Sequence, residues 1–153
     1  MIDLAPPLML AAAALLADAR LDRDFDAQAL TCLALNVYHE ARGESREGQL
    51  AVAHVTLNRA EAQGHPDDIC SVVTETRGAS CQFGWWCDGR SVTPRNEAAY
   101  DRALRVSLDA LRGESADPTD GATFFVSSRL ARPGWTRRLT QTASIEGHVF
   151  FRP

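Results

Sequence analysis

The sequence predicts an α+β fold, with a mainly helical core and a small antiparallel sheet. Apolar residues recur at helical spacing in three segments between residues 26 and 111. Two short β-like runs follow near the C-terminus, and a loop that contains Trp and Arg separates them. A chain of 153 residues has the length of a single domain with one hydrophobic core. We therefore expect one folded unit in which helices precede strands.

The first apolar segment, APPLMLAAAALLA at residues 5–17, predicts a helix that packs on the domain. The segment also resembles the core of a signal peptide or a weak membrane anchor, but Asp3 and no positive charge precede it. It is too short to span a bilayer comfortably, so we expect no stable membrane span. The predicted division is an N-terminal segment, residues 1–26, and a domain, residues 27–153.

Two helices are predicted at the start of the domain. Asp26 can cap a helix that runs to about Ala41, and Ser45 can cap a second helix through Ala60. The second helix is apolar on several sides, which predicts a central position in the core. The apolar stripe of the first helix consists of Leu30, Leu33, Ala34, Val37 and Ala41.

The second half of the chain alternates between irregular and regular segments. Residues 64–96 are rich in Gly, Pro, Asp, Ser and Cys and predict a long structured loop region. Thr93-Pro94 predicts the start of a third helix, with Pro at its first position and Gly113 after its end. The runs Ala122–Val126 and His148–Phe151 are expected to pair as antiparallel strands.

The charge pattern excludes some functions. The net charge of −4 gives no reason to expect a nucleic acid as the main partner. All 16 basic residues are Arg, so lysine-dependent chemistry such as Schiff-base formation is excluded. Residues 121–153 hold five Arg and one Glu, and we interpret this basic segment as a solvated surface rather than a site for an anionic polymer.

The four cysteines predict disulfide bonds more than a metal site. The closest pair is separated by five residues, which does not fit zinc-ligand spacing, and the four histidines show no metal-ligand spacing either. We expect a disulfide among Cys70, Cys81 and Cys87, and a buried thiol at Cys32. Such a disulfide implies an oxidising compartment. No metal and no cofactor are expected.

A candidate catalytic carboxylate lies in the stretch NVYHEARGES at residues 36–45. On a helical wheel Glu40 falls about 20° from Leu33, at the margin of the apolar stripe. Partial burial raises the pKa of a carboxyl group, and the negative end of the helix dipole acts in the same direction. A proton held near neutral pH would let Glu40 act as a general acid. The alternative is a simple ion pair with Arg42 or Arg46.

The stretch CQFGWWCDG, residues 81–89, is a candidate sugar-binding loop. Aromatic faces beside amide and carboxylate groups suit sugar rings, although an aromatic cluster that closes a loop has the same composition. Trp135 could extend such a groove or pack beneath it. A cysteine nucleophile, Cys81 or Cys87 with His148 as base, is a further alternative. The candidate substrate-binding residues are Tyr38, Gln82, Phe83, Trp85, Trp86 and Asp88.

Taken in order, the motifs resemble the SleB/CwlJ family of cell wall hydrolases. They are YHEARGES, EGQLAVAHVTLNR, CQFGWWCDG and the GAT…PGWTRRLTQTASIEGHVFFRP pattern of residues 121–153. The resemblance covers about residues 28–153 and implies a lysozyme-like fold, peptidoglycan as substrate and Glu40 as the catalytic residue. Two positions depart from the family pattern: Phe124-Phe125 replaces His-Tyr, and Gly84 replaces Ser.

The resemblance and the lone motif carboxylate lead to one expected reaction. Glu40 is expected to cleave the bond between N-acetylmuramic acid and N-acetylglucosamine as a lytic transglycosylase. Lysozyme-type hydrolysis assisted by Glu44, Glu47 or Asp88, and a glycan-binding module without catalysis, are the alternatives. We expect a monomer that acts in the periplasm or cell wall. A phage-type lysis protein is a further option, and the export route is open.

Overall fold

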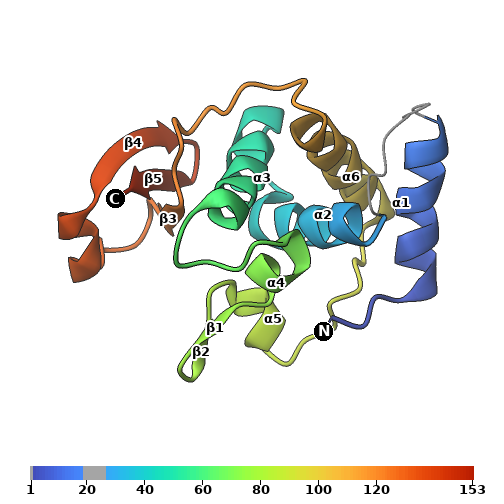
Figure 1. The fold of residues 1–153 in the computed structure, drawn as a ribbon, viewed down its shortest axis with the longest axis horizontal. Coiled ribbons are helices and arrows are strands. Elements are labelled where there is room, and N and C mark those ends of the chain that lie inside the picture. The colour runs from blue at the N-terminus through green and yellow to red at the C-terminus, as the bar shows by residue number, and fades with distance from the viewer. Residues whose placement is uncertain (1, 19–26) are drawn as a thin grey trace.

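The computed structural model describes residues 2–18 and 27–153 (Figure 1). It is mainly helical with two small antiparallel sheets, which confirms the predicted α+β class. Figure 1 shows α3 in the middle, with α2, α6 and α1 on one side and β3, β4 and β5 on the other. The elements are α1 (Pro6–Asp18), α2 (Ala27–Ala41), α3 (Arg46–Glu61), α4 (Ile69–Val73), β1 (Thr76–Arg77), β2 (Ser80–Cys81), α5 (Gly84–Cys87), α6 (Glu97–Leu111), β3 (Phe124–Ser127), a 3-10 helix (Gly134–Arg138), β4 (Thr140–Ile145) and β5 (His148–Arg152).

The helix α3 is central, as its all-round apolar pattern predicts. Ser45 is its N-cap, and the Ser45 hydroxyl accepts a hydrogen bond from the backbone N–H of Gly48 at 3.4 Å. This bond satisfies one of the free donors at the helix start, which confirms the predicted cap. One side of α3 packs against α2, α4 and α6, and its other side contacts the sheet through Ala51 and Val55.

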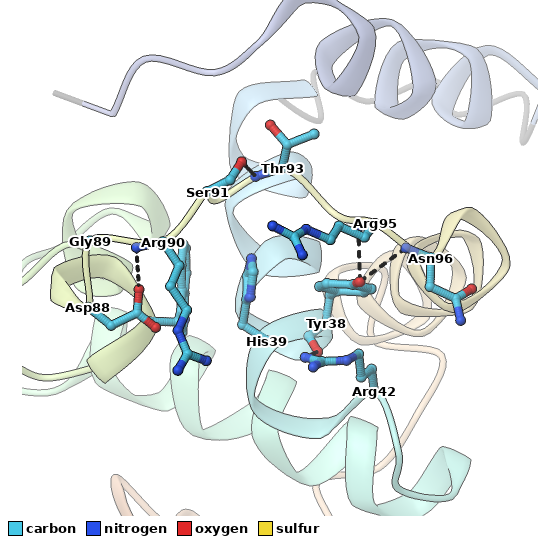
Figure 2. Close-up of a pocket in the computed structure, with 11 residues that line it drawn as sticks. Tyr38, His39, Arg42, Asp88, Gly89, Arg90, Ser91, Thr93, Arg95 and Asn96 are labelled. Atoms are coloured by element: carbon cyan, nitrogen blue, oxygen red, sulfur yellow. Dashed lines mark hydrogen bonds between the residues drawn. The ribbon is translucent and has the colours of Figure 1, made fainter.

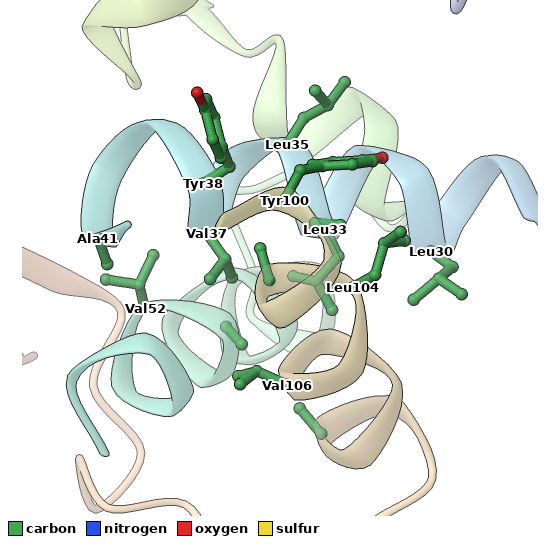
Figure 3. Close-up of a cluster of buried hydrophobic side chains, with 14 of the residues drawn as sticks. Leu30, Leu33, Leu35, Val37, Tyr38, Ala41, Val52, Tyr100, Leu104 and Val106 are labelled. Carbon is green, nitrogen blue, oxygen red and sulfur yellow. The ribbon is translucent and has the colours of Figure 1, made fainter. Parts of the chain in front are cut away.

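The main core lies between α2, α3 and α6 (Figure 3). The apolar stripe predicted for α2 is buried, and the helix begins at Ala27, so the expected cap at Asp26 lies outside the described residues. Figure 3 shows Leu33 and Val37 of α2 facing Leu104 of α6. Burying each such side chain contributes roughly 1.5–3 kcal/mol, so this three-helix contact holds the end of α2 in place.

The predicted N-terminal helix is present as α1 and packs on α2. Leu8 and Ala12 are buried in the main core, whereas Leu10 is exposed. Among the described residues, every helix is too short or too polar to cross a membrane.

The start of α6 differs from the prediction. The helix begins at Glu97, with Asn96 as N-cap, rather than at Pro94. The Tyr38 hydroxyl accepts hydrogen bonds from the backbone N–H groups of Arg95 at 3.1 Å and Asn96 at 3.2 Å. These two bonds keep the backbone at residues 95–96 attached to α2, so the helix starts only after Asn96. The predicted end is correct, because Gly113 follows α6 with a φ of +68°.

The three-stranded sheet has the order β3-β5-β4. The predicted pairing of the two C-terminal runs is confirmed, since Phe124 pairs with Phe151 and Ser127 with His148 in antiparallel register. The edge strand β4 was not predicted. Its sequence, TQTASI, has one large apolar residue, Ile145, so alternation is too weak to reveal it.

The tight turn between β4 and β5 is joined to the α2–α3 connection by hydrogen bonds from backbone N–H groups to glutamate side chains. The backbone N–H of Ser45 donates to Glu146 at 2.9 Å, and that of Gly147 donates to Glu44 at 3.4 Å. A Cβ at Gly147 would lie 2.6 Å from Oε1 of Glu44, so a larger residue there would displace the Glu44 side chain from its present position. This contact places β5 against the C-terminal end of α2.

All four cysteines form disulfides, Cys32–Cys70 and Cys81–Cys87. The expectation of a free thiol at Cys32 was wrong, because α4 packs on α2 and brings Cys70 beside it. A disulfide within the group Cys70, Cys81 and Cys87 was correctly predicted. The alternative of a cysteine nucleophile paired with His148 is excluded in this structure, since both candidate thiols are oxidised.

Candidate active site

Glu40 lies on the last turn of α2 and lines a cavity of about 250 Å³, hereafter the Glu40 cavity. The predicted residues Gln82 and Phe83 also line it. Glu40 is the single carboxylate among the described residues of the lining, so one acidic group dominates this space. The lining residues are Glu40, Arg59, Gln82, Phe83, Gly84, Phe125, Val126, Ser127 and His148.

The environment of Glu40 favours its protonated form. Burial raises the pKa of this carboxyl group from its ordinary value of 4.5 to about 7, and the positive charge of Arg59 opposes the rise only in part. The physical cause is desolvation, because the charged carboxylate loses hydration in the cavity. Near neutral pH the group can therefore both give and accept a proton, as a general acid–base catalyst requires.

Arg59 is buried in the lining of the Glu40 cavity. The side chain is 4% exposed, and its Nε donates to the Thr123 carbonyl at 2.7 Å. Its guanidinium carbon lies 4.8 Å from the ring centroid of Phe83 and 5.8 Å from that of Phe124. The buried Nη1 has no hydrogen-bond partner in the described part of the chain. A buried charged donor without a partner is costly, so Nη1 is available to an oxygen atom of a ligand.

His148 completes the wall formed by the sheet. Its ring packs edge-on against Phe125 at a centroid separation of 5.0 Å, and burial lowers the pKa of the imidazole. Its Nδ1 lies 3.7 Å from Oε1 of Glu44, beyond hydrogen-bond distance. The imidazole therefore faces the cavity in a mainly neutral form.

The other acidic candidates are not part of the lining of the Glu40 cavity. Glu44 contacts Gly147 at the β4–β5 turn, and its pKa is raised by burial and by Glu146. Glu47 lines a separate pocket near Leu50, and Asp88 lies beyond α5. Across residues 2–18 and 27–153, no three His, Cys, Asp or Glu side chains cluster in a way that would hold a metal ion.

The loop at residues 81–89, hereafter the aromatic loop, contributes residues to two separate pockets. Phe83 is buried against the Glu40 cavity, whereas Trp85 faces a second pocket. The Trp85 indole N–H donates to the buried Asn36 side chain at 2.9 Å, which fixes the ring. Trp86 packs edge-on against Trp85 and lines neither space.

The second pocket has a volume of about 900 Å³ and is named here the arginine pocket (Figure 2). Three of the predicted residues, Tyr38, Trp85 and Asp88, line it. The His39 ring stacks on Trp85 at a centroid distance of 4.5 Å and forms the wall on the α2 side. The lining comprises Tyr38, His39, Arg42, Trp85, Asp88, Gly89, Arg90, Ser91, Thr93, Arg95 and Asn96.

Residues 43–151 match the family described as Cell Wall Hydrolase. This chain belongs to that family. The match begins three residues after Glu40 and includes Arg59, the aromatic loop and the three-stranded sheet. The resemblance inferred from the motifs is thereby confirmed.

Relatives within the family include spore cortex-lytic enzymes. The enzyme of Halalkalibacterium halodurans is 37% identical over 118 residues, which are 77% of this chain and 33% of that protein. The enzyme of Bacillus subtilis is 34% identical over the same length, 35% of that protein. This chain thus spans only about a third of the length of these curated relatives.

Two solved catalytic domains have a similar fold. The catalytic domain of the Bacillus cereus SleB protein matches with a TM-score of 0.70 and 30% identity, covering 86% of this chain and 95% of that one. The catalytic domain of the germination-specific lytic transglycosylase SleB from Bacillus anthracis gives the same score and identity, with 100% of that chain covered.

The two departures from the cell wall hydrolase pattern border the site. Gly84 lines the Glu40 cavity, and a Cβ built there meets open space, so the structure has room for a serine at this position. Phe125 lines the cavity, and Phe124 lies 5.7 Å from the half-exposed Trp135, measured between ring centroids. Trp135 thus continues the aromatic surface from Phe124 toward solvent, the place expected for a groove extension.

Arg59 and His148 are site residues that sequence reasoning missed as members of the cavity. A signal for Arg59 was present, because it follows Val52 by seven residues and Val55 by four, on a buried face of α3. A charged residue on such a face needs a partner or a function. His148 gave no comparable signal, because its place depends on the pairing of β5 with both neighbouring strands.

Proposed function

We propose that this chain cleaves peptidoglycan glycan strands between N-acetylmuramic acid and N-acetylglucosamine, as a lytic transglycosylase with Glu40 as its single catalytic carboxylate. The observation that carries the proposal is the partly buried Glu40, with a pKa near 7, as the lone acid among the described residues lining its cavity. Membership of the cell wall hydrolase family supports the same substrate. Residues 27–153 form the proposed catalytic unit.

The proposed reaction uses Glu40 twice. Protonated Glu40 first donates its proton to the glycosidic oxygen, the bond from that oxygen to C1 of the muramic residue breaks, and an oxocarbenium-like state develops at C1. The C6 hydroxyl of the same residue then attacks C1 and gives its proton to the Glu40 carboxylate. The products are a 1,6-anhydro-muramic end and a free hydroxyl on the leaving N-acetylglucosamine, and no water is consumed.

Neighbouring groups have distinct proposed tasks. Nη1 of Arg59 is free to donate to a substrate oxygen, and its positive charge keeps Glu40 from being locked in the protonated form. Gln82 lines the same cavity and can hold a sugar hydroxyl or acetamido group. Phe83 and Phe125 exclude water from the oxocarbenium-like state, which would otherwise be hydrolysed.

The product distinguishes this reaction from lysozyme-type hydrolysis. Digestion of purified peptidoglycan, followed by mass spectrometry, should give 1,6-anhydro-muramic ends. Reducing-end muramic acid without anhydro product would exclude the transglycosylase reaction. Under the hydrolytic alternative, Glu44→Gln, Glu47→Gln or Asp88→Asn should abolish activity as completely as Glu40→Gln, which we do not expect because none of these residues lines the Glu40 cavity.

The alternative of a glycan-binding module without catalysis is tested on the same substrate. Zymography on cell walls should show a cleared band for the wild type and for Glu61→Gln, a control at an exposed position at the end of α3. Glu40→Gln should give no band, with a circular dichroism spectrum that matches the wild type. A fully active Glu40→Gln variant would defeat the assignment, and binding to cell walls without any clearing would favour the module.

The proposed location is the cell wall, in the periplasm of the producing cell. Two disulfides suit an oxidising compartment, and the proposed substrate lies outside the cytoplasmic membrane. One chain carries every residue of the proposed site, so we propose that the enzyme acts as a monomer. A phage-type lysis protein that reaches the same substrate through a membrane pore is the second option, and genome context would distinguish them.

A further inference from the structure

The arginine pocket lies directly beside the Glu40 cavity, and neighbouring residues of the chain form the walls of both. His39 lines the pocket and Glu40 the cavity, just as Trp85 lines the pocket and Gly84 the cavity. Consecutive Cα atoms lie about 3.8 Å apart, so both spaces border the same two segments, the end of α2 and the short helix α5. A ligand in the cavity could therefore extend a branch into the pocket.

The pocket contains three arginines, Arg42, Arg90 and Arg95. Within the described ranges none of them forms an ion pair with a carboxylate, whereas five other arginines do. In the view of Figure 2, His39 lies between the side chain of Arg90 and those of Arg42 and Arg95. Unpaired guanidinium groups around one concave space favour a ligand with several anionic oxygens.

The loop that carries Arg90 and Arg95 is held in position by hydrogen bonds to α2. The Tyr38 hydroxyl accepts the backbone N–H groups of Arg95 and Asn96, and Nε2 of His39 lies 2.9 Å from the Val92 carbonyl oxygen. Burial lowers the pKa of His39, so its ring adds little charge. These bonds hold the backbone that carries Arg95 in place, while the side chains of Arg42, Arg90 and Arg95 are exposed and accessible to a ligand.

One acid, Asp88, lies among the arginines. Its Oδ1 accepts the backbone N–H of Arg90 at 2.8 Å, and no cation in the described part of the chain forms an ion pair with it. Three cations and one anion would match a ligand with several carboxylates and one amine. A phosphate polymer would match the arginines but would be repelled by Asp88.

We propose that the arginine pocket binds the acidic peptide stem that branches from the muramic residue, through the stem carboxylates on Arg90 and Arg95 and its side-chain amine on Asp88. This inference rests on the proposed function, since Glu40 must act on the glycan that carries the stem. An extended tetrapeptide reaches roughly 13 Å, well beyond the sugar to which it is attached. The enzyme would then distinguish glycan that bears peptides from bare glycan.

The test compares two substrates and two charge-matched double variants. Arg90→Gln with Arg95→Gln removes two pocket cations, and Arg102→Gln with Arg105→Gln removes the same charge from exposed positions of α6. On intact peptidoglycan the pocket variant should raise KM about tenfold, the size expected for two solvent-accessible charge-assisted contacts. On glycan strands stripped of stems by an amidase it should match the wild type, and the α6 control should match it on both substrates.

Each other kinetic outcome contradicts the proposal. An equal loss on both substrates would mean that the arginines serve the glycan or the fold. No loss on either substrate would mean that the pocket does not contact the stem. If the wild type cleaves neither substrate, the proposed function fails, and the pocket is then judged by direct binding.

Direct binding uses a free stem tetrapeptide and calorimetry with the intact wild-type chain. The affinity should weaken at least tenfold in the pocket variant and should fall with salt, because exposed charges are screened. Asp88→Asn should weaken binding of the tetrapeptide. It should not change binding of a tetrapeptide whose side-chain amine is acetylated. Inorganic phosphate or glycerol phosphate that binds as well as the tetrapeptide, or absence of tetrapeptide binding, would overturn the proposal.

Discussion

The carboxyl group of Glu40 and the guanidinium group of Arg59 line the same cavity, and burial shifts the pKa of each toward its neutral form. The pKa of Glu40 is raised to about 7 and that of Arg59 is lowered to about 10. Each charge stabilises the charged form of the other group, so each pKa shift is smaller than burial alone would cause. The pair therefore places a proton that moves near neutral pH beside a cation that remains charged.

The first prediction concerns the pH dependence of cleavage. Glu40 must hold its proton to protonate the glycosidic oxygen, so kcat/KM should fall as pH rises through about 7. The fall should approach tenfold for each further pH unit. Initial rates on solubilised glycan strands between pH 5 and 9 would measure it. A profile that stays flat to pH 9 would contradict Glu40 as the acid.

The second prediction concerns stability. The folded pKa of Glu40 is raised from 4.5, so its favourable contribution is complete below pH 4.5 and is lost as pH rises through about 7. Glutamine mimics the protonated form at every pH. Glu40→Gln should therefore match the wild type at pH 4 and exceed its unfolding free energy by about 3 kcal/mol at pH 8.

Urea unfolding at both pH values measures this difference. If the unfolding free energies of Glu40→Gln and the wild type differ equally at pH 4 and pH 8, burial of the Glu40 charge is not the cause of the difference. The exposed substitution Glu61→Gln controls for the loss of a surface carboxylate.

The third prediction separates the charge of Arg59 from its shape. Arg59→Gln removes the cation that lowers the pKa of Glu40, so the alkaline limb of activity should move to higher pH, whereas Arg59→Lys should leave it in place. At pH 6 the Gln variant should lose about tenfold to a hundredfold in kcat/KM, because a charged donor to substrate is gone. If the alkaline fall in activity stays at the same pH in Arg59→Gln, the Arg59 charge does not lower the pKa of Glu40.

Arg59 also donates a hydrogen bond to the Thr123 carbonyl, and Arg59→Gln removes this bond together with a buried charge, so the fold of the variant must be checked. Circular dichroism at the assay temperature would confirm that the variant is folded before its pH profile is interpreted.

The sequence was informative where one local pattern decides the structure. The spacing of Leu33 and Glu40 predicted a half-buried carboxylate, and burial in the cavity is what raises its pKa. The predictions failed where a contact between residues far apart in the sequence decides the structure. Cys32 pairs with a residue on α4, and the polar strand β4 exists because β5 offers a free edge. The division of the aromatic loop between two spaces likewise depends on where α5 meets α2.

The fourth prediction contrasts the two disulfides. Replacing Cys32 and Cys70 by Ala opens a link across 38 residues and should cost about 4 kcal/mol of unfolding free energy, with little effect on kcat/KM in the folded protein. Replacing Cys81 and Cys87 opens a link across six residues and should cost only about 2 kcal/mol. Because this link closes the loop that carries Gln82 and Phe83, KM should rise severalfold. The reverse pattern in urea unfolding and kinetics would contradict these roles.

The last prediction uses Gly84 to test whether the Glu40 cavity is the substrate site. A side chain at Gly84 meets open space and its backbone is unstrained, so substitution should leave the fold intact. Gly84→Ser restores the hydroxyl expected from the family pattern and should keep kcat/KM within about threefold, because it occupies little of the roughly 250 Å³ cavity. Gly84→Leu should fill much of that space and lower kcat/KM more than about tenfold, with an unchanged melting temperature. Gly43→Leu is the matched control, since its side chain also meets open space but lies outside the cavity. If Gly84→Leu and Gly43→Leu cleave peptidoglycan equally well, the substrate does not occupy the space beside Glu40.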